Sequence, residues 1–170
     1  MNQRSTLQIL VVQGSILEAD AQAIVNAANS LGFMGGGVAG VIKRAAGVGV
    51  EEEARRQAPI PVGQAVWTSG GKTGFQGIIH APTMPQPAMR IEPRNVGLAT
   101  KAALTVAEEQ GLESVALPGM GTGVGGVVHG DAATEMIRAI RTFSPRRLRT
   151  VVLVDVDPAM VQAWRDTLNT

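Results

Sequence analysis

The chain has 170 residues, of which 45% are hydrophobic and 17% are charged, and its formal net charge is +1. This composition is typical of a single globular domain that buries a core, and the absence of cysteine excludes disulfides, thiolate metal sites and cysteine catalysis. Because the net charge is small and only 3% of the residues are aromatic, neither general nucleic-acid binding nor base stacking along a single strand is indicated.

The first half of the chain alternates apolar strands with helices and glycine-rich turns. Aliphatic and β-branched runs predict strands over residues 7–13, 23–27, 63–69 and 77–81. Helices are predicted over residues 38–46 and 50–57, and Gly47 ends the first of them. Opposite charges three and four positions apart in the second helix indicate that Glu51–Glu53 belong to a solvated face. Residues 82–93 contain four prolines and no clear period, which predicts a loop.

The second half repeats the alternation. Helices are predicted over residues 96–110, from His129 or Asp131 to about residue 143, and over 159–168. Strands are predicted over residues 114–118 and 150–155. This order predicts an α/β fold with helices on both faces of a mostly parallel sheet. Ligands of such sheets bind at the carboxyl ends of the strands, so the site is expected at that edge.

Two glycine-rich loops each follow a predicted strand and precede a predicted helix. The first contains Gly35–Gly37, and the second spans Gly119–Gly126. In this geometry the backbone comes close to an anion, and free N–H groups and the helix dipole face it. Two such loops at one edge of the sheet predict a site for a diphosphate. Asn26 and Asn29, in the stretch before the first loop, add neutral amide groups that suit sugar hydroxyls.

The second loop also contains the glycine spacing of the dinucleotide-binding fingerprint, at Gly121, Gly123 and Gly126. That fingerprint is expected at the first strand, with an acidic residue about twenty positions later, whereas here it lies late and Asp155 is too distant. A Rossmann-like redox domain is therefore only a remote alternative. His80 and His129 lack catalytic or metal-binding spacing, and we interpret them as a hydrogen-bonded structural residue and a surface or capping residue.

Both loops and their flanks resemble the signature of the macro domain family. The matching stretches are Val25–Asn29, Gly35–Ile42, Ala45–Gly47, Pro118 and Gly121–Gly126. The resemblance implies a three-layer α/β/α sandwich with a central mixed, mostly parallel sheet, formed by residues 1–170 as one domain. It also implies binding of ADP-ribose. Many members hydrolyse ADP-ribose esters, either O-acetyl-ADP-ribose or the links in ADP-ribosylated protein and nucleic-acid ends.

The resemblance also implies roles for residues along the cleft between the loops. Asn29 is expected at the distal ribose and is the candidate catalytic residue. One side of the diphosphate is expected to meet Gly36, Gly37, Val38 and Ala39, and the other side Thr122, Gly123, Val124, Gly125 and Gly126. Gly14, Ser15 and Ile16 fall where the family meets adenine, and Val154 and Asp155 fall beside the adenosine.

The chain departs from the family pattern at three of these positions. Ser15 replaces an aspartate that accepts a hydrogen bond from the adenine amino group, and losing such a charge-assisted bond costs roughly 1.5–3 kcal/mol. Val154 or Asp155 stands where an aromatic ring often meets the adenosine. Ala39 stands where one hydrolytic branch carries an aspartate, so a carboxylate general base is missing there. Other branches with alanine at that position are credited with hydrolysis through substrate-assisted activation of water.

The sequence thus predicts a protein that binds ADP-ribose or a close derivative and hydrolyses ADP-ribose esters slowly at most. A non-catalytic ADP-ribose-binding or nucleotide-binding module is the alternative. Partners would be ADP-ribose itself and ADP-ribosylated protein or nucleic acid, with no cofactor and no metal. No apolar run is long enough to span a membrane, and the one near the N-terminus is too short for a signal peptide, which predicts a cytoplasmic protein.

Overall fold

The structure, a computed structural model, describes residues 6–170. Residues 1–5, which belong to the predicted domain of residues 1–170 and to the N-terminal segment discussed above, lie outside the described residues. Its centre is a six-stranded sheet with the order β1-β6-β5-β2-β4-β3. The strands are β1 (Gln8–Gln13), β2 (Ala23–Asn29), β3 (Val66–Thr68), β4 (Gly77–Met84), β5 (Ser114–Leu117) and β6 (Thr150–Asp155). Only β3 runs antiparallel to its neighbour, which confirms the predicted mixed, mostly parallel sheet.

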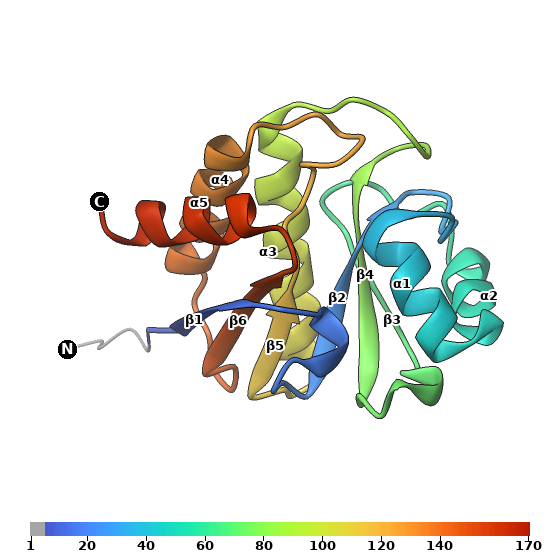
Figure 1. The fold of residues 1–170 in the computed structure, drawn as a ribbon. Helices are drawn as coiled ribbons and strands as arrows, with labels where there is room; N and C mark the ends of the chain where they lie inside the picture. Colours follow the sequence, from blue (N-terminus) through green and yellow to red (C-terminus); the bar gives the residue numbers. More distant parts are fainter. Residues whose placement is uncertain (1–5) are drawn as a thin grey trace.

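Helices cover both faces of the sheet, as Figure 1 shows. They are α1 (Gly37–Ala46), α2 (Val48–Arg56), α3 (Pro93–Glu109), α4 (His129–Thr142) and α5 (Pro158–Leu168), with short 3₁₀ helices η1 (Ile16–Glu18) and η2 (Gly71–Thr73). One hydrophobic core joins α3, α4 and α5 to the sheet, and a second joins α1 and α2 to its other face. The predicted three-layer α/β/α sandwich is therefore confirmed.

Each of the two cores lies on one face of the sheet, because side chains alternate between the two faces along a strand. In β2, Ala23 and Val25 belong to the core beneath α3–α5, whereas Ile24 belongs to the core beneath α1 and α2. All three are fully buried, as expected for a parallel strand covered on both faces. The central strands are therefore held rigidly, and their carboxyl ends present the loops of the site from a fixed frame.

Two strands, β4 and β3, differ most from their predicted extents. The strand predicted over 77–81 continues as β4 to Met84, through Pro82, into residues predicted as a loop. Proline is tolerated there because β3 pairs only with residues 78–80, so the N–H that Pro82 lacks is not needed on that side. The strand predicted over 63–69 shrinks to β3, since the chain before it turns at Gly63, which has a φ of 103°.

The helices match the predicted pattern with shifted ends: α2 begins at Val48 and α3 at Pro93, two and three residues earlier than predicted. Proline fits the first turn of α3 because the first N–H groups of a helix have no intrahelical acceptor. Between residues 6 and 170 no helix is both long and apolar enough to cross a bilayer. The same residues hold no group of three or more His, Cys, Asp or Glu side chains that could ligate a metal ion.

Candidate functional site

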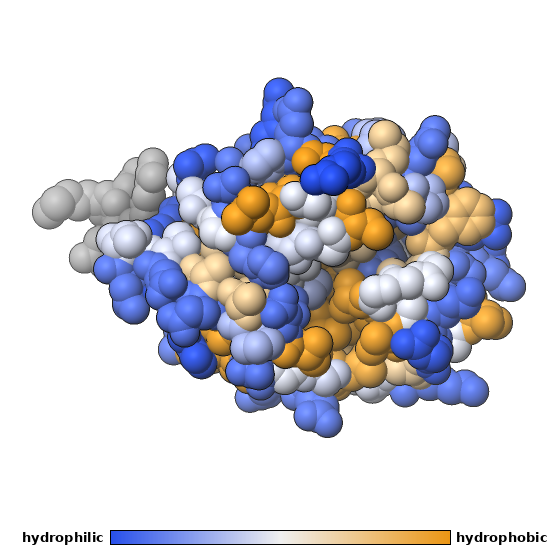
Figure 2. Space-filling view, turned by 45° about the horizontal axis from the view of Figure 1, so that its top comes forward, coloured by the Kyte–Doolittle hydropathy of each residue, from blue (hydrophilic) through white to orange (hydrophobic). Residues whose placement is uncertain are grey.

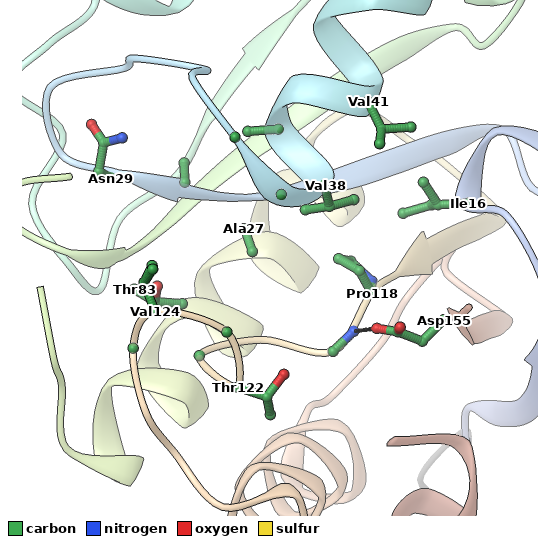
Figure 3. A pocket seen from close by; sticks show the side chains of 18 of the residues that line it. Ile16, Ala27, Asn29, Val38, Val41, Thr83, Pro118, Thr122, Val124 and Asp155 are labelled. Atoms are coloured by element: carbon green, nitrogen blue, oxygen red, sulfur yellow. Dashed lines mark hydrogen bonds between the residues drawn. The ribbon is translucent and has the colours of Figure 1, made fainter. Parts of the chain in front are cut away.

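A cavity of about 890 Å³ opens at the carboxyl edge of the sheet. Its walls come from both glycine-rich loops, from the β1–η1 turn and from the ends of β2 and β6. Figure 2 shows hydrophobic residues gathered around a hollow on this face of the molecule. In Figure 3, α1 and Ile16 lie on one side of the cavity and the second glycine loop on the other, with Asn29 and Asp155 far apart.

Most residues predicted for the site are brought together by this cavity. The lining includes Gly14, Ser15, Ile16, Asn29, Gly36, Gly37, Val38, Ala39, Thr122, Gly123, Val124, Gly125, Val154 and Asp155. Gly126 does not belong to the lining; its N–H donates to the Gly123 carbonyl at 3.1 Å, and it closes the second loop. Sequence positions more than one hundred residues apart thus line one cavity, because parallel strands end at the same edge.

The first glycine loop delivers the start of α1 to the cavity. Gly36 is the N-cap and makes no side-chain capping bond, and Gly37 takes a φ of 58°, which favours glycine. The first N–H groups of a helix have no partner within it, so those of Gly37, Val38 and Ala39 are available to an anion. A Cβ on either glycine would meet no atom within 4 Å, so the backbone there is open to a ligand.

Asn29 holds this loop in place. Its Oδ1 accepts hydrogen bonds from the N–H groups of Leu31 and Phe33 at 3.1 and 3.4 Å, and its Nδ2 donates to the Phe33 carbonyl at 2.9 Å. One amide hydrogen of Asn29 has no acceptor among these contacts, and Asn29 is one of the residues that line the cavity. Asn29 therefore shapes the loop as well as lining the cavity.

Glu51 fastens the same loop from α2, which corrects the interpretation of Glu51–Glu53 as a solvated face. Its Oε2 accepts the Met34 N–H at 2.7 Å, and its Oε1 pairs with the Lys43 ammonium at 2.9 Å. Burial alone would raise the pKa of Glu51, but the bonds from Lys43 and Met34 outweigh it and lower that pKa. Glu53 is also engaged, since its carboxylate accepts from the N–H and hydroxyl of Ser69.

We expect Glu51→Ala to lower the free energy of unfolding by about 1–2 kcal/mol, because the Met34 N–H loses its charged acceptor. Urea unfolding measures this loss, and amide hydrogen exchange should show faster opening of residues 31–34. Glu52→Ala is the matched control, because Glu52 is exposed and its pair with Arg56, at 3.8 Å, contributes little. Equal stabilities for the two variants would contradict a clamping role for Glu51.

The second glycine loop is a compact turn closed by its own backbone. The Val127 N–H donates to the Gly121 carbonyl at 2.9 Å. Gly121 has a φ of 77°, and a Cβ on Gly125 would lie 2.6 Å from the Gly121 oxygen, so both positions require glycine. The Ile91 N–H donates to the Gly125 carbonyl at 2.9 Å, which ties the loop to the segment between β4 and α3.

That segment is a part of the site that the sequence did not indicate. Pro87 and Ala88 line the cavity, and Thr83 and Met84 at the end of β4 lie beside them. Ala88 has a φ of 61°, which is uncommon for a residue with a side chain. The prolines of residues 82–93 indicated a loop, but no local pattern showed that it would lie against the second glycine loop.

The charges of the cavity are unusual for a site that would hold a diphosphate. Of the described residues that line it, none is Lys, Arg or His, and Asp155 is the sole charged side chain. Any anion bound here must be held by backbone N–H groups and helix dipoles rather than by ion pairs. Asp155 is itself fixed, since its Oδ2 accepts from the Gly119 N–H and its Oδ1 from the Asp157 N–H, both at 2.9 Å (Figure 3 draws the first).

Asn26, expected at the site with Asn29, lies elsewhere. It is buried in the sheet, where its Nδ2 is 3.2 Å from the Nδ1 of His80, and the His80 Nε2 is 2.9 Å from the Thr68 hydroxyl. Burial lowers the pKa of His80 to about 4, although Glu53 nearby raises it slightly. His80 therefore is a neutral, hydrogen-bonded structural residue. His129 opens α4 on the surface and pairs with Asp157 at 2.8 Å.

The fold and the cavity define a three-layer α/β/α domain whose ligand site lies between two glycine-rich loops. The sequence model of the macro domain matches residues 25–136. The chain belongs to the macro domain family.

Relatives and solved structures agree with this assignment. An uncharacterized protein of Aquifex aeolicus is 55% identical over 96% of this chain and 99% of its own length, and one of Aeropyrum pernix is 49% identical over 86% and 77%. The Oceanobacillus iheyensis macrodomain with ADP is 26% identical, covers 94% of this chain and 88% of its own, and superimposes with a TM-score of 0.81. A glycine-to-valine variant of that macrodomain, with ADP-ribose, is 25% identical over 99% and 95%, with a TM-score of 0.83.

Proposed function

We propose that this protein binds ADP-ribose in the cavity between its two glycine-rich loops. The observation that carries the proposal is the cavity itself, which is walled by the backbone of both loops and by the uncapped start of α1. The family membership supports the choice of ligand, because macrodomains of similar fold have structures with ADP and ADP-ribose. ADP-ribosylated protein or nucleic acid would present the same group.

In this proposal the ligand lies along the cavity from Ile16 to Asn29. The diphosphate occupies the centre, where Gly36, Gly37 and Val38 face Thr122–Gly125 across the cavity. The distal ribose lies near Asn29, whose free amide hydrogen donates to a hydroxyl group. The base lies at the other end, between Gly14–Ile16 and the end of β6. Hydrolysis of ADP-ribose esters is the second candidate function, and the pocket's lack of a general base near Asn29 limits it to slow turnover.

The direct test is thermal unfolding with and without ADP-ribose. A ligand that binds only the native state stabilises it by about 2.7 kcal/mol at one hundred times its Kd, so the melting temperature should rise with ligand concentration. AMP and ribose 5-phosphate, each carrying only part of the ligand, should give smaller shifts at equal concentration. A melting temperature unchanged by millimolar ADP-ribose would overturn the proposal.

A side chain introduced into the second glycine loop should weaken the binding of ADP-ribose. Gly123 lines the cavity, and a Cβ there would meet no atom within 4 Å, so valine fits the empty protein but takes up space beside the diphosphate. We expect Gly123→Val to weaken ADP-ribose binding about tenfold or more, equivalent to at least about 1.4 kcal/mol, without lowering the melting temperature of the free protein. Calorimetric titration measures the affinity.

Gly49→Val is the matched control for this change. Gly49 lies in α2, outside the cavity, and also has no atom within 4 Å of a built Cβ. Its affinity for ADP-ribose should equal that of the wild type. If both variants bind ADP-ribose as tightly as the wild type, the second loop is only a structural turn and does not bind the diphosphate.

A further inference from the structure

We propose that Arg90 supplies the positive charge that the cavity lining lacks: its guanidinium lies against the second glycine loop and strengthens the binding of an anionic group there. The inference rests on the proposed function, which places a diphosphate at this loop. It begins from two observations. The described residues that line the cavity include no Lys, Arg or His, and the Arg90 guanidinium packs on the loop directly outside that lining.

The second glycine loop presents unused backbone donors to the cavity. Residues 122–125 all line the cavity, and within residues 6–170 none of their N–H groups donates to a backbone carbonyl. The next two N–H groups instead close the loop, from Gly126 to Gly123 at 3.1 Å and from Val127 to Gly121 at 2.9 Å. Successive free N–H groups in a turn form a concave site for an anion. The backbone of the loop itself therefore indicates where an anion binds.

Arg90 lies against the same loop. A Cβ built on Gly126 would lie 3.0 Å from the Arg90 Nη2 and 3.2 Å from both its Cζ and its Nε. Because the three atoms are at nearly equal distances, the guanidinium turns its flat face toward the Gly126 backbone. Gly126 does not line the cavity, but Gly125 before it does, so the positive charge lies close to the cavity without entering it.

The neighbours of Arg90 fasten this part of the chain to the loop. Ile91 donates its N–H to the Gly125 carbonyl at 2.9 Å, and its Cδ1 would lie 3.1 Å from a Cβ built on Gly121. On the other side of Arg90, Ala88 lines the cavity. The segment that contains Arg90 is thus tied to the second loop at one end and forms part of the cavity wall at the other.

The charge of Arg90 is not neutralised by the protein. Among residues 6–170 its guanidinium forms no ion pair within 4.0 Å, although Glu92 is only two positions away. Asp155, the sole charged side chain of the described lining, is negative and opposes the binding of an anion. A nearby unpaired cation offsets that repulsion, because a charge acts over distance and needs no direct contact with the ligand. Arg90 is therefore assigned as a positioning residue that acts through the loop.

Arg90→Gln tests the charge, since glutamine removes it and keeps a planar group at the Gly126 backbone. We expect the affinity for ADP-ribose to fall about fivefold at about 0.02 M NaCl and to come within about twofold of the wild type at about 0.5 M, because salt screens an exposed charge. Calorimetric titration measures both values. Equal affinities of variant and wild type at low salt would overturn the inference while leaving the proposed function intact. Failure of the wild type to bind ADP-ribose would overturn both.

Two further variants separate charge from packing and from net charge. Arg90→Lys keeps the charge without the flat face, so its affinity and salt dependence should stay within about twofold of the wild type. Arg141→Gln is the matched control, because Arg141 lies in the last turn of α4, roughly 18 Å along that helix from its start. It should bind ADP-ribose as the wild type does. If the lysine variant lost as much affinity as glutamine at every salt concentration, Arg90 would only pack on the loop, and an equal loss in Arg141→Gln would reduce the effect to net charge; either result would overturn the inference.

Discussion

The wild-type protein is expected to hydrolyse O-acetyl-ADP-ribose only slowly. Its turnover rate should be about 10²–10⁴-fold lower than that of a comparable hydrolase that has a general base. Ester hydrolysis at neutral pH needs an activated water. The one ionisable group among the described residues lining the cavity is Asp155, which lies at the end opposite Asn29 (Figure 3). His80 is buried in the sheet and does not reach the cavity. The proposed mechanism therefore relies on a water held between the substrate phosphate and the distal ribose, without a general base.

Asn29→Ala should lower the remaining turnover and the affinity for ADP-ribose together. The change removes the amide group that the proposed binding mode places at the distal ribose, and it also removes three hydrogen bonds that shape residues 31–33. Time courses of O-acetyl-ADP-ribose cleavage, with calorimetry on the same samples, measure both quantities. Fast cleavage by the wild type that survives Asn29→Ala would contradict this mechanism and point to another base.

Ala39→Asp tests the missing base directly. Ala39 lines the cavity near the start of α1 and is 7% exposed, so an aspartate there places a carboxylate at the cavity wall, partly buried. Turnover should rise if the water site is intact. Stability should fall, because part of the new charge is desolvated. A variant that is less stable and no faster would show that the water lies out of reach of that position.

We also expect the free energy of unfolding to fall at acid pH because of the buried His80 side chain. Burial lowers the pKa of His80 from 6.5 to about 4, so below pH 6.5 the unfolded chain binds a proton that the native protein does not. The stability associated with neutral His80 is fully present above pH 6.5 and is lost as the pH falls toward 4. At about 1.4 kcal/mol for each unit of pKa difference, the loss reaches roughly 3 kcal/mol.

Urea unfolding at a series of pH values measures this loss. His80→Gln should flatten the dependence between pH 6.5 and 4.5, a window above that in which Glu51, Glu53 and Glu108 titrate, since their pKa values are lowered from 4.5. His129→Gln is the matched control, because it removes the other histidine, which lies on the surface. Acid sensitivity that persists in His80→Gln would show that the buried ring is not its source.

The sequence by itself determined the features that depend on residues close to one another along the chain. Apolar runs gave the strands, and glycine triplets and spacings gave the two loops, because a left-handed backbone and a close approach are local requirements met by Gly37, Gly121 and Gly125. The alternation of strands and helices then implied a parallel sheet whose strand ends share one edge. The family resemblance placed Asn29 and Asp155 at the cleft, and both line the cavity.

Only the tertiary structure decided the contacts between distant segments. The Met34 N–H meets Glu51 seventeen residues away, Asn26 meets His80 fifty-four residues away, and Gly119 meets Asp155 thirty-six residues away. A charge pattern on α2 cannot show that Glu51 turns inward, because a helix face is solvated or buried according to what packs on it. Likewise, Asn26 and Asn29 are equivalent in the sequence, but Asn26 lies within β2 opposite His80, whereas Asn29 is the last residue of β2, after the register shift that follows Ala28.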